Sequence, residues 1–152
     1  MQASSKAIDL IKEFEGFKDK AYLCPAGYLT IGYGHVITTS LEPELKTKTI
    51  TKEEAESLLQ DDLKYFVGYV NEICSLNNIT LMQNQFDALC SFCFNLGNFT
   101  NAMLERFKAK DIASIGNSLI LYNKAGGKVL EGLTRRRKAE QKKARRRKGA
   151  EE

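Results

Sequence analysis

Apolar side chains recur at intervals of three and four residues along most of the chain, the spacing that gives an α-helix one apolar face. The pattern predicts helices over residues 5–15, 50–73, 81–97, 99–108, 111–122 and 131–148. Ser4 or Ser5 can cap the start of the first helix, and Gly16 lies just past its end, where helices commonly stop. The chain is therefore expected to be mainly helical.

The second and third of these helices carry further signals. Thr51 and Glu54 form a capping box at the start of the second helix, which is long enough to link two lobes. We expect Thr80 to cap the third helix and Gly97 to end it. Because this third helix is apolar nearly all round, we expect it at the centre of a domain.

The pattern changes to alternation in the segment AYLCPAGYLTIGYG, residues 21–34. Alternating apolar and polar positions are typical of strands, and Pro25-Ala26-Gly27 supplies a turn. A β-hairpin is therefore expected here, with a third short strand or a loop near His35.

The expected fold class is α+β, mainly helical, in one domain over residues 1–152. A small antiparallel sheet lies in an N-terminal lobe at about residues 14–50. The long helix connects it to a helical C-terminal lobe at about residues 75–152, which also takes helix 5–15. A cleft between two such lobes is a natural ligand site.

Composition supports a folded domain with an uneven charge distribution. Hydrophobic residues make up 43% of the chain, which is enough for a core and unlike a disordered chain. Residues 134–152 carry ten Lys and Arg against three acids, whereas residues 1–133 carry thirteen against sixteen. The basic C-terminal end suggests an anionic partner, although such a segment is often only a solvated helix face.

The cysteines favour packing over metal or redox chemistry. Cys90 and Cys93 form a C-x-x-C inside the apolar run FDALCSFCFNLG, and His35 is the chain's single histidine. A zinc site would need further ligands, and a redox pair would be expected at a helix N-terminus. We expect small apolar thiols in a helical core, with no metal and no cofactor.

A carboxyl, a thiol and a hydroxyl lie close together near the hairpin. Glu15 stands at the end of the first helix, and Cys24 and Thr30 lie on successive strands. A protonated carboxyl can act as a general acid, a thiolate as a base or nucleophile, and a hydroxyl can position a water. An acid opposite a base with an ordered water suits glycoside hydrolysis. From these residues alone, a solvated acid and a buried thiol remain the alternative.

The stretch from Glu15 to His35 resembles the phage lysozymes, the endolysins of glycoside hydrolase family 24. Its pattern is E-G-x-x-x-x-A-Y-x-C-x-x-G-x-x-T-I-G-Y-G-H, with eight residues between Glu15 and Cys24 and five between Cys24 and Thr30. The segments ITKEEAESLLQDDL, LMQNQFDALCSFCFNLG and GLTRRRKAE are similar too, in the same order. The resemblance covers roughly residues 5–141.

The resemblance implies a two-lobed lysozyme-like fold and a bacteriolytic hydrolase of the cell wall. Its substrate would be the β-1,4 bond between N-acetylmuramic acid and N-acetylglucosamine in peptidoglycan. Glu15 would be the general acid, with Cys24 where many relatives have aspartate and Thr30 on the water side. The implied residues that bind substrate or support the site are Tyr22, His35, Asn95, Arg136 and Arg137. Among these, His35 is mainly structural in the family, and one of the two arginines would approach Glu15.

The cysteine leaves the mechanism open. A free thiol is mostly protonated at pH 7 unless its surroundings stabilise the thiolate. Cys24 can act as a base toward water, as a nucleophile or as a polar support. Inversion at the anomeric carbon is favoured over retention, because Thr30 offers a group that positions water.

Three other functions are weighed against this one. A Cys24/His35 hydrolase lacks an evident orienting residue. A nucleic-acid-binding protein would rely on the basic end alone, without a recognition motif. A non-catalytic, lysozyme-like wall-binding module would not need both Glu15 and Thr30.

The start MQASSKAIDLIKEFEG has no apolar run of signal-peptide type. We therefore expect a monomer held in the host cytoplasm until a holin-like partner releases it to the cell wall, in the periplasm of a Gram-negative host. The basic end, which continues as KKARRRK over residues 142–148, is expected to bind an anionic envelope surface.

Overall fold

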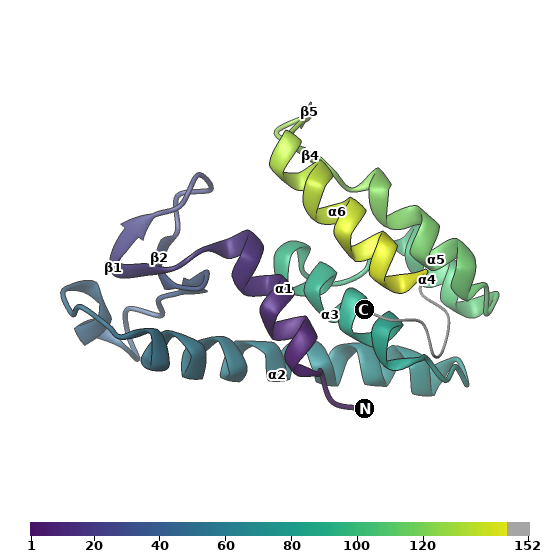
Figure 1. Cartoon of the computed structure of the whole chain (residues 1–152), viewed down its shortest axis with the longest axis horizontal. Helices are drawn as coiled ribbons and strands as arrows, with labels where there is room; N and C mark the ends of the chain where they lie inside the picture. The colour runs from purple at the N-terminus through teal and green to yellow at the C-terminus, as the bar shows by residue number, and fades with distance from the viewer. Residues whose placement is uncertain (146–152) are drawn as a thin grey trace. The chain divides into compact units, whose positions relative to one another are not determined.

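The computed structural model describes residues 1–145 and shows a mainly helical chain with two small antiparallel sheets in that range (Figure 1). In chain order the elements are α1 (Ser5–Glu15), β1 (Lys18–Leu23), β2 (Leu29–Gly32), β3 (His35–Val36), η1 (Pro43–Lys46), α2 (Lys52–Leu76), α3 (Gln83–Leu96), α4 (Asn101–Lys108), α5 (Ile112–Ser118), η2 (Leu119–Leu121), β4 (Lys124–Ala125), β5 (Lys128–Val129) and α6 (Glu131–Ala144). The expected α+β fold class is confirmed.

The chain divides into two compact units, which we call the N-terminal unit and the C-terminal unit. Among the described residues, the N-terminal unit comprises residues 8–65, and the C-terminal unit combines residues 1–7 with residues 66–145. Most of α1 therefore belongs to the N-terminal unit, although we expected it in the C-terminal lobe. Lys12 of α1 shows why, because it pairs with Glu56 of α2 and lies 5.4 Å from the ring centroid of Tyr33.

The sheet of the N-terminal unit has the strand order β1-β2-β3, with antiparallel neighbours. Tyr22 pairs with Thr30 across β1 and β2. In the turn that joins them, Cys24 N donates to Tyr28 O at 2.9 Å, and Gly27 takes the left-handed φ of +87° that favours glycine. The predicted hairpin and its third strand are confirmed.

The long helix α2 begins at the predicted capping box. Thr51 N donates to Glu54 Oε1 at 3.2 Å, and Glu54 N donates to Thr51 Oγ1 at 3.1 Å. Apolar side chains form the core of the N-terminal unit. They come from α1, the sheet, the loop before α2 and the first half of α2. They include Ile11, Ile31, Ile37, Leu45, Ile50, Ala55, Leu59 and Leu63. This core fixes the strands against both helices.

The C-terminal unit is built around α3, whose residues 86–93 are all buried, as its uniform apolar pattern predicts. The expected cap at Thr80 was wrong. Leu81 is buried before the helix, Met82 has an extended backbone (φ −72°, ψ 157°), and α3 begins only at Gln83. There the Gln85 side chain accepts from Met82 N at 2.9 Å, so a glutamine takes the capping role. Gly97 ends the helix at φ +90°, as expected.

Between α4 and α6 the C-terminal unit differs from the expected pattern. The helix expected over residues 111–122 is divided into α5 and the 3-10 helix η2. Gly126 and Gly127 form the turn of a β4–β5 hairpin and have φ values of +58° and +80°. Helix α6 packs against α3 and ends at Ala144. The part of the predicted basic helix at residues 146–148 lies outside the described residues.

Three of the four cysteines are buried, as expected from their apolar neighbours. Cys74, Cys90 and Cys93 are buried free thiols, whereas Cys24 is half-exposed. Burial raises the pKa of all three buried thiols. The C-x-x-C motif therefore belongs to the core. Within residues 1–145, no helix combines the length and the apolar character that crossing a membrane requires.

Candidate active site

The three residues expected to carry the chemistry all belong to the N-terminal unit. Glu15 is the last residue of α1, Cys24 directly follows β1, and Thr30 lies in β2. The tight turn from Gly16 (φ +70°) into β1 and the hairpin bring them into one region of the chain. Local structure, rather than a distant contact, therefore assembles this set.

The side chain of Glu15 lies close to Gly34, where a larger residue would meet it. A Cβ atom added to Gly34 would lie 2.7 Å from Glu15 Oε1, closer than real Cβ contacts come, and 3.1 Å from Glu15 Cδ, which is a tight contact. Gly34 also has φ +81°, a conformation that side chains rarely adopt. The positive φ favours glycine at the second glycine of TIGYGH, and any larger residue would force the half-buried carboxyl of Glu15 to shift.

The turn between β1 and β2 stabilises the Cys24 thiolate. The pKa of Cys24 is lowered from its ordinary value, mainly by a hydrogen bond from the backbone N–H of Tyr28. Partial burial opposes this shift, while the N–H groups of Ala26 and Gly27 and the Thr30 hydroxyl add to it. N–H groups directed at sulfur favour its charged form. A half-exposed thiol with a lowered pKa can serve as a base or a nucleophile.

Thr30 has one hydroxyl proton and two neighbours that can accept it. Thr30 Oγ1 donates to Tyr28 O at 2.9 Å, and the same hydroxyl can turn toward the Cys24 thiolate. While it donates to the carbonyl, its lone pairs are available to accept a hydrogen bond from a water. Although Thr30 is only 4% exposed, its partners place it beside the thiol. This geometry suits a group that orients water.

Tyr22 lies within electrostatic reach of both candidate catalytic groups. Its pKa is raised first by burial and then by the negative charges of Glu15 and Cys24. A phenol keeps its proton in such surroundings and can donate a hydrogen bond. The structure therefore brings Tyr22 together with the expected catalytic set.

His35 is held by two carboxylates. Its Nδ1 lies 2.8 Å from Asp62 Oδ2 on α2, and its Nε2 lies 2.8 Å from Glu42 Oε2 in the loop before η1. The hydrogen bond with Asp62 is the main cause that raises the pKa of His35 to about 9; burial opposes the shift and Glu42 adds to it. Both ring nitrogens are occupied, so His35 joins β3 to the loop and to α2. It is not available as a base for Cys24.

We expect the His35→Ala variant to be less stable than the wild type by about 1–3 kcal/mol at pH 6. The folded pKa of about 9 exceeds the ordinary 6.5. The stabilisation is therefore fully present below about pH 6.5 and is lost as pH rises through 9. Urea unfolding at pH 6 and pH 9.5 measures this. The exposed pair of Lys64 and Asp61 is the control, because Lys64→Ala should change little. A stability loss that is equal at both pH values would contradict the assignment.

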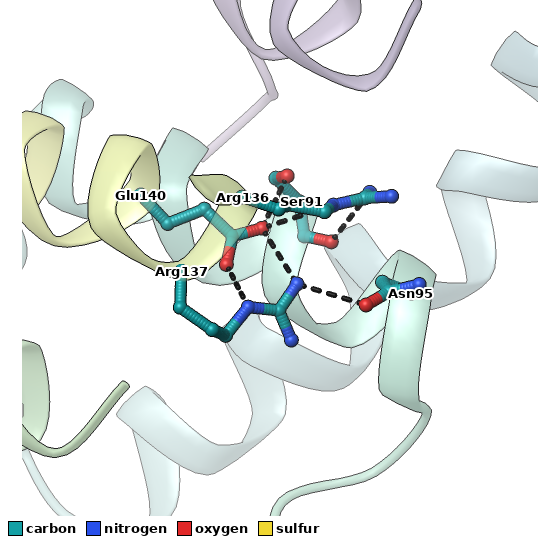
Figure 2. Close-up of polar contacts among 5 residues, drawn as sticks. All are labelled: Ser91, Asn95, Arg136, Arg137 and Glu140. Atoms are coloured by element: carbon teal, nitrogen blue, oxygen red, sulfur yellow. Dashed lines mark hydrogen bonds and ion pairs between the residues drawn. The ribbon is translucent and has the colours of Figure 1, made fainter. Parts of the chain in front are cut away.

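The other expected site residues form a buried network in the C-terminal unit (Figure 2). Arg137 Nε lies 2.8 Å from Glu140 Oε1, and Arg137 Nη2 donates to Asn95 Oδ1 at 2.9 Å. Arg136 Nη2 donates to the Ser91 carbonyl at 3.2 Å, and Ser91 Oγ donates to Glu140 Oε2 at 2.6 Å. The network joins α3 to α6. Glu15 belongs to the other unit, and the approach of an arginine to it stays a prediction.

Sequence reasoning missed four residues that hold the expected ones in place. They are Glu42 and Asp62 beside His35, and Ser91 and Glu140 beside the arginines. Only Glu140 left a signal, because it follows Arg136 and Arg137 by four and three residues on one helix. Among residues 1–145, no group of three or more His, Cys, Asp or Glu side chains could hold a metal ion.

Comparison with known proteins identifies the family and the fold of this chain. The phage lysozyme family matches residues 12–140. The endolysin of Bacillus phage B103 is 38% identical over 145 residues, covering 92% of this chain and 52% of the relative, so this chain spans about half its length. The endolysin of Salmonella phage P22 is 36% identical over 141 residues, covering 91% of this chain and 94% of the relative. The muramidase domain of SpmX from Asticaccaulis excentricus has a TM-score of 0.79 at 32% identity, covering 96% and 99% of the two chains.

A mainly helical chain with a small antiparallel sheet, similar over nearly its whole length to a muramidase domain, places this chain in the class of lysozyme-like folds. Within that class, the chain belongs to the phage lysozyme family.

Proposed function

We propose that this protein is an endolysin that acts as a muramidase. It hydrolyses the β-1,4 bond between N-acetylmuramic acid and N-acetylglucosamine in bacterial peptidoglycan and thereby lyses the cell. The observation that carries the proposal is the grouping of Glu15, the low-pKa thiol of Cys24 and Thr30 around one hairpin. The likeness to a muramidase domain over 96% of the chain supports the choice of substrate.

The proposed mechanism uses each group once. Glu15 gives its proton to the glycosidic oxygen as the bond to the anomeric carbon breaks. A water held by Thr30 attacks that carbon from the opposite face, and the Cys24 thiolate takes the proton that the water loses. The sugar product has the inverted configuration. Tyr22 and Asn95 bind the glycan, and His35 supports the sheet through Asp62 and Glu42.

Zymography tests this proposal. The purified protein is run in a gel that contains peptidoglycan, and a cleared band at its position is the expected result. The control is the same protein, heat-treated and not refolded, on a matched gel. It should give no cleared band. Binding to peptidoglycan without clearing would support a non-catalytic wall-binding module instead. Cleavage of peptide or ester substrates alone would support a Cys24 hydrolase.

We further propose that the exposed cationic face of α6 binds an anionic envelope polymer or lipid surface. Arg135, Lys138, Lys142 and Arg145 are exposed and lie three or four residues apart, which puts them on one face of the helix. Lys138 and Lys142 have no ion-pair partner among the described residues. Cations that lack a partner attract anionic surfaces, and salt screens this attraction.

The Lys138→Glu/Lys142→Glu variant should bind cell walls several-fold more weakly at low salt and equally at high salt. Cleavage of soluble glycan fragments should not change. Lys124→Glu/Lys128→Glu, on the exposed β4–β5 hairpin, makes the same charge change elsewhere in the unit. Sedimentation with purified walls measures binding. If both variants bind walls equally at low salt, the cationic face of α6 is only solvated and does not bind the wall.

Access to the wall, rather than folding, is proposed to control when the protein acts. It waits as a monomer in the host cytoplasm, and a separate membrane-disrupting partner of the holin kind releases it. Bacteria that express the protein alone should stay intact and should lyse within minutes when the membrane is permeabilised. Lysis without permeabilisation would contradict this part of the proposal.

A further inference from the structure

The buried guanidinium of Arg137 holds the amide of Asn95 in one orientation. Arg137 Nη2 donates to Asn95 Oδ1 at 2.9 Å, as Figure 2 shows. A guanidinium carries only donors, so only the oxygen of the amide can face it. The chemistry of the partner therefore fixes which amide atom is oxygen. The NH₂ group of Asn95 is turned away from Arg137.

Arg137 itself has little freedom to move. Its side chain is fully buried, its Nε lies 2.8 Å from Glu140 Oε1, and its guanidinium carbon lies 4.9 Å from the ring centroid of Phe92. Glu140 is fixed in turn by the hydroxyl of Ser91 at 2.6 Å. An ion pair, an aromatic face and a second hydrogen bond thus support the group that orients Asn95.

The amide nitrogen of Asn95 is the free end of this arrangement. Asn95 is half-buried near the C-terminal end of α3, and within residues 1–145 no hydrogen-bond partner is found for its Nδ2 atom. A donor that is fixed in direction and left without a partner is suited to an acceptor on a ligand. Arg137 is fully buried and reaches such a ligand only through Asn95.

We propose that Arg137 is a positioning residue that turns the Asn95 NH₂ group toward an acceptor oxygen of the glycan. This inference rests on the proposed muramidase function. The acetamido carbonyl and hydroxyl oxygens of the wall glycan are neutral acceptors that match an amide donor. Arg137 reduces the ordering that Asn95 must undergo when it binds, so its effect appears in substrate binding.

Four variants test the proposal: Asn95→Ala, Asn95→Asp, Arg137→Lys and the double variant Asn95→Ala/Arg137→Lys. Asn95→Asp keeps an acceptor for Arg137 but removes the NH₂ donor. Asn95→Ala and Asn95→Asp should each raise KM for soluble glycan fragments roughly 3- to 10-fold, with a smaller change in kcat. Arg137→Lys should raise KM by a similar factor, because an ammonium does not reproduce the planar fork.

The double variant separates positioning from a merely structural role. In the Asn95→Ala background, Arg137→Lys should produce no further rise in KM, since there is no amide left to orient. Thermal unfolding shows that each variant is folded at the assay temperature. If Arg137→Lys does not fold, Ser91→Ala takes its place, because it removes the hydrogen bond that fixes Glu140 beside Arg137. Its rise in KM should likewise be absent in the Asn95→Ala background.

Two results would overturn the inference. One is a wild-type KM for Asn95→Asp, and the other is a rise in KM for Arg137→Lys that is equal in both backgrounds. A wild-type protein without activity on peptidoglycan would instead defeat the proposed function, so the two failures are distinguishable.

Discussion

Glu15→Gln is expected to lower the lysis rate at least about a hundredfold while leaving thermal unfolding near that of the wild type. The amide keeps the size of the carboxyl group that rests on Gly34 but has no proton to give to the leaving oxygen. A turbidity assay on permeabilised bacteria measures the rate.

Glu13→Gln is the matched control, because Glu13 is an exposed acid on the same helix and loses the same charge. It should keep nearly full activity. If Glu15→Gln is as active as Glu13→Gln, Glu15 is not the general acid. An inactive but unfolded Glu15→Gln variant would point to a structural role, which is why unfolding is measured beside lysis.

Substitutions of Cys24 are expected to give the second largest effect, and the order of activities identifies its role. Cys24→Ala should lose activity by about a hundredfold or more, and Cys24→Ser should lose most of it, since a serine hydroxyl is a poor base. Cys24→Asp should keep substantial activity, because a carboxylate can also accept a proton from water. A fully active Cys24→Ala would leave Glu15 and Thr30 to act alone.

The pH dependence of the wild type tests the ionisation of Cys24. The lowered pKa of Cys24 means that activity should begin to rise with pH below the ordinary thiol range. Iodoacetamide should inactivate the enzyme along the same rising limb, and glycan should protect it. The three buried cysteines should react more slowly.

The local parts of this molecule could be predicted from its sequence because neighbouring residues determine them. The capping box of Thr51 and Glu54, the turn before Tyr28 and the end of α3 at Gly97 each depend on a few consecutive residues. The grouping of Glu15, Cys24 and Thr30 belongs to the same class, since one helix end and one hairpin place them.

What could not be predicted depends on residues far apart in the chain. His35 finds Asp62 on a helix 27 residues later, and Ser91 finds Glu140 after 49 residues. No local pattern states such pairings. The expected cap at Thr80 failed for a related reason. Leu81 is buried outside the helix, and α3 begins only at Gln83, where the Gln85 side chain bonds Met82 N.

The assignment of most of α1 to the N-terminal unit also depends on a contact between residues far apart in the chain. Its ion pair from Lys12 to Glu56 spans 44 residues, so the helix pattern alone could not show which unit it joins. The β4–β5 hairpin was missed because its strands have only two residues each, too few for alternation to appear.

The central claim is that this chain hydrolyses the bond at the reducing end of N-acetylmuramic acid, and the identity of the new sugar end tests it most directly. Purified peptidoglycan is digested, reduced with borohydride, hydrolysed and analysed by mass spectrometry. The account predicts that muramitol derivatives increase with time for the wild type and not for Glu15→Gln. Reduced glucosamine ends would contradict it. So would anhydro-muramic acid at the newly formed end, which borohydride cannot reduce.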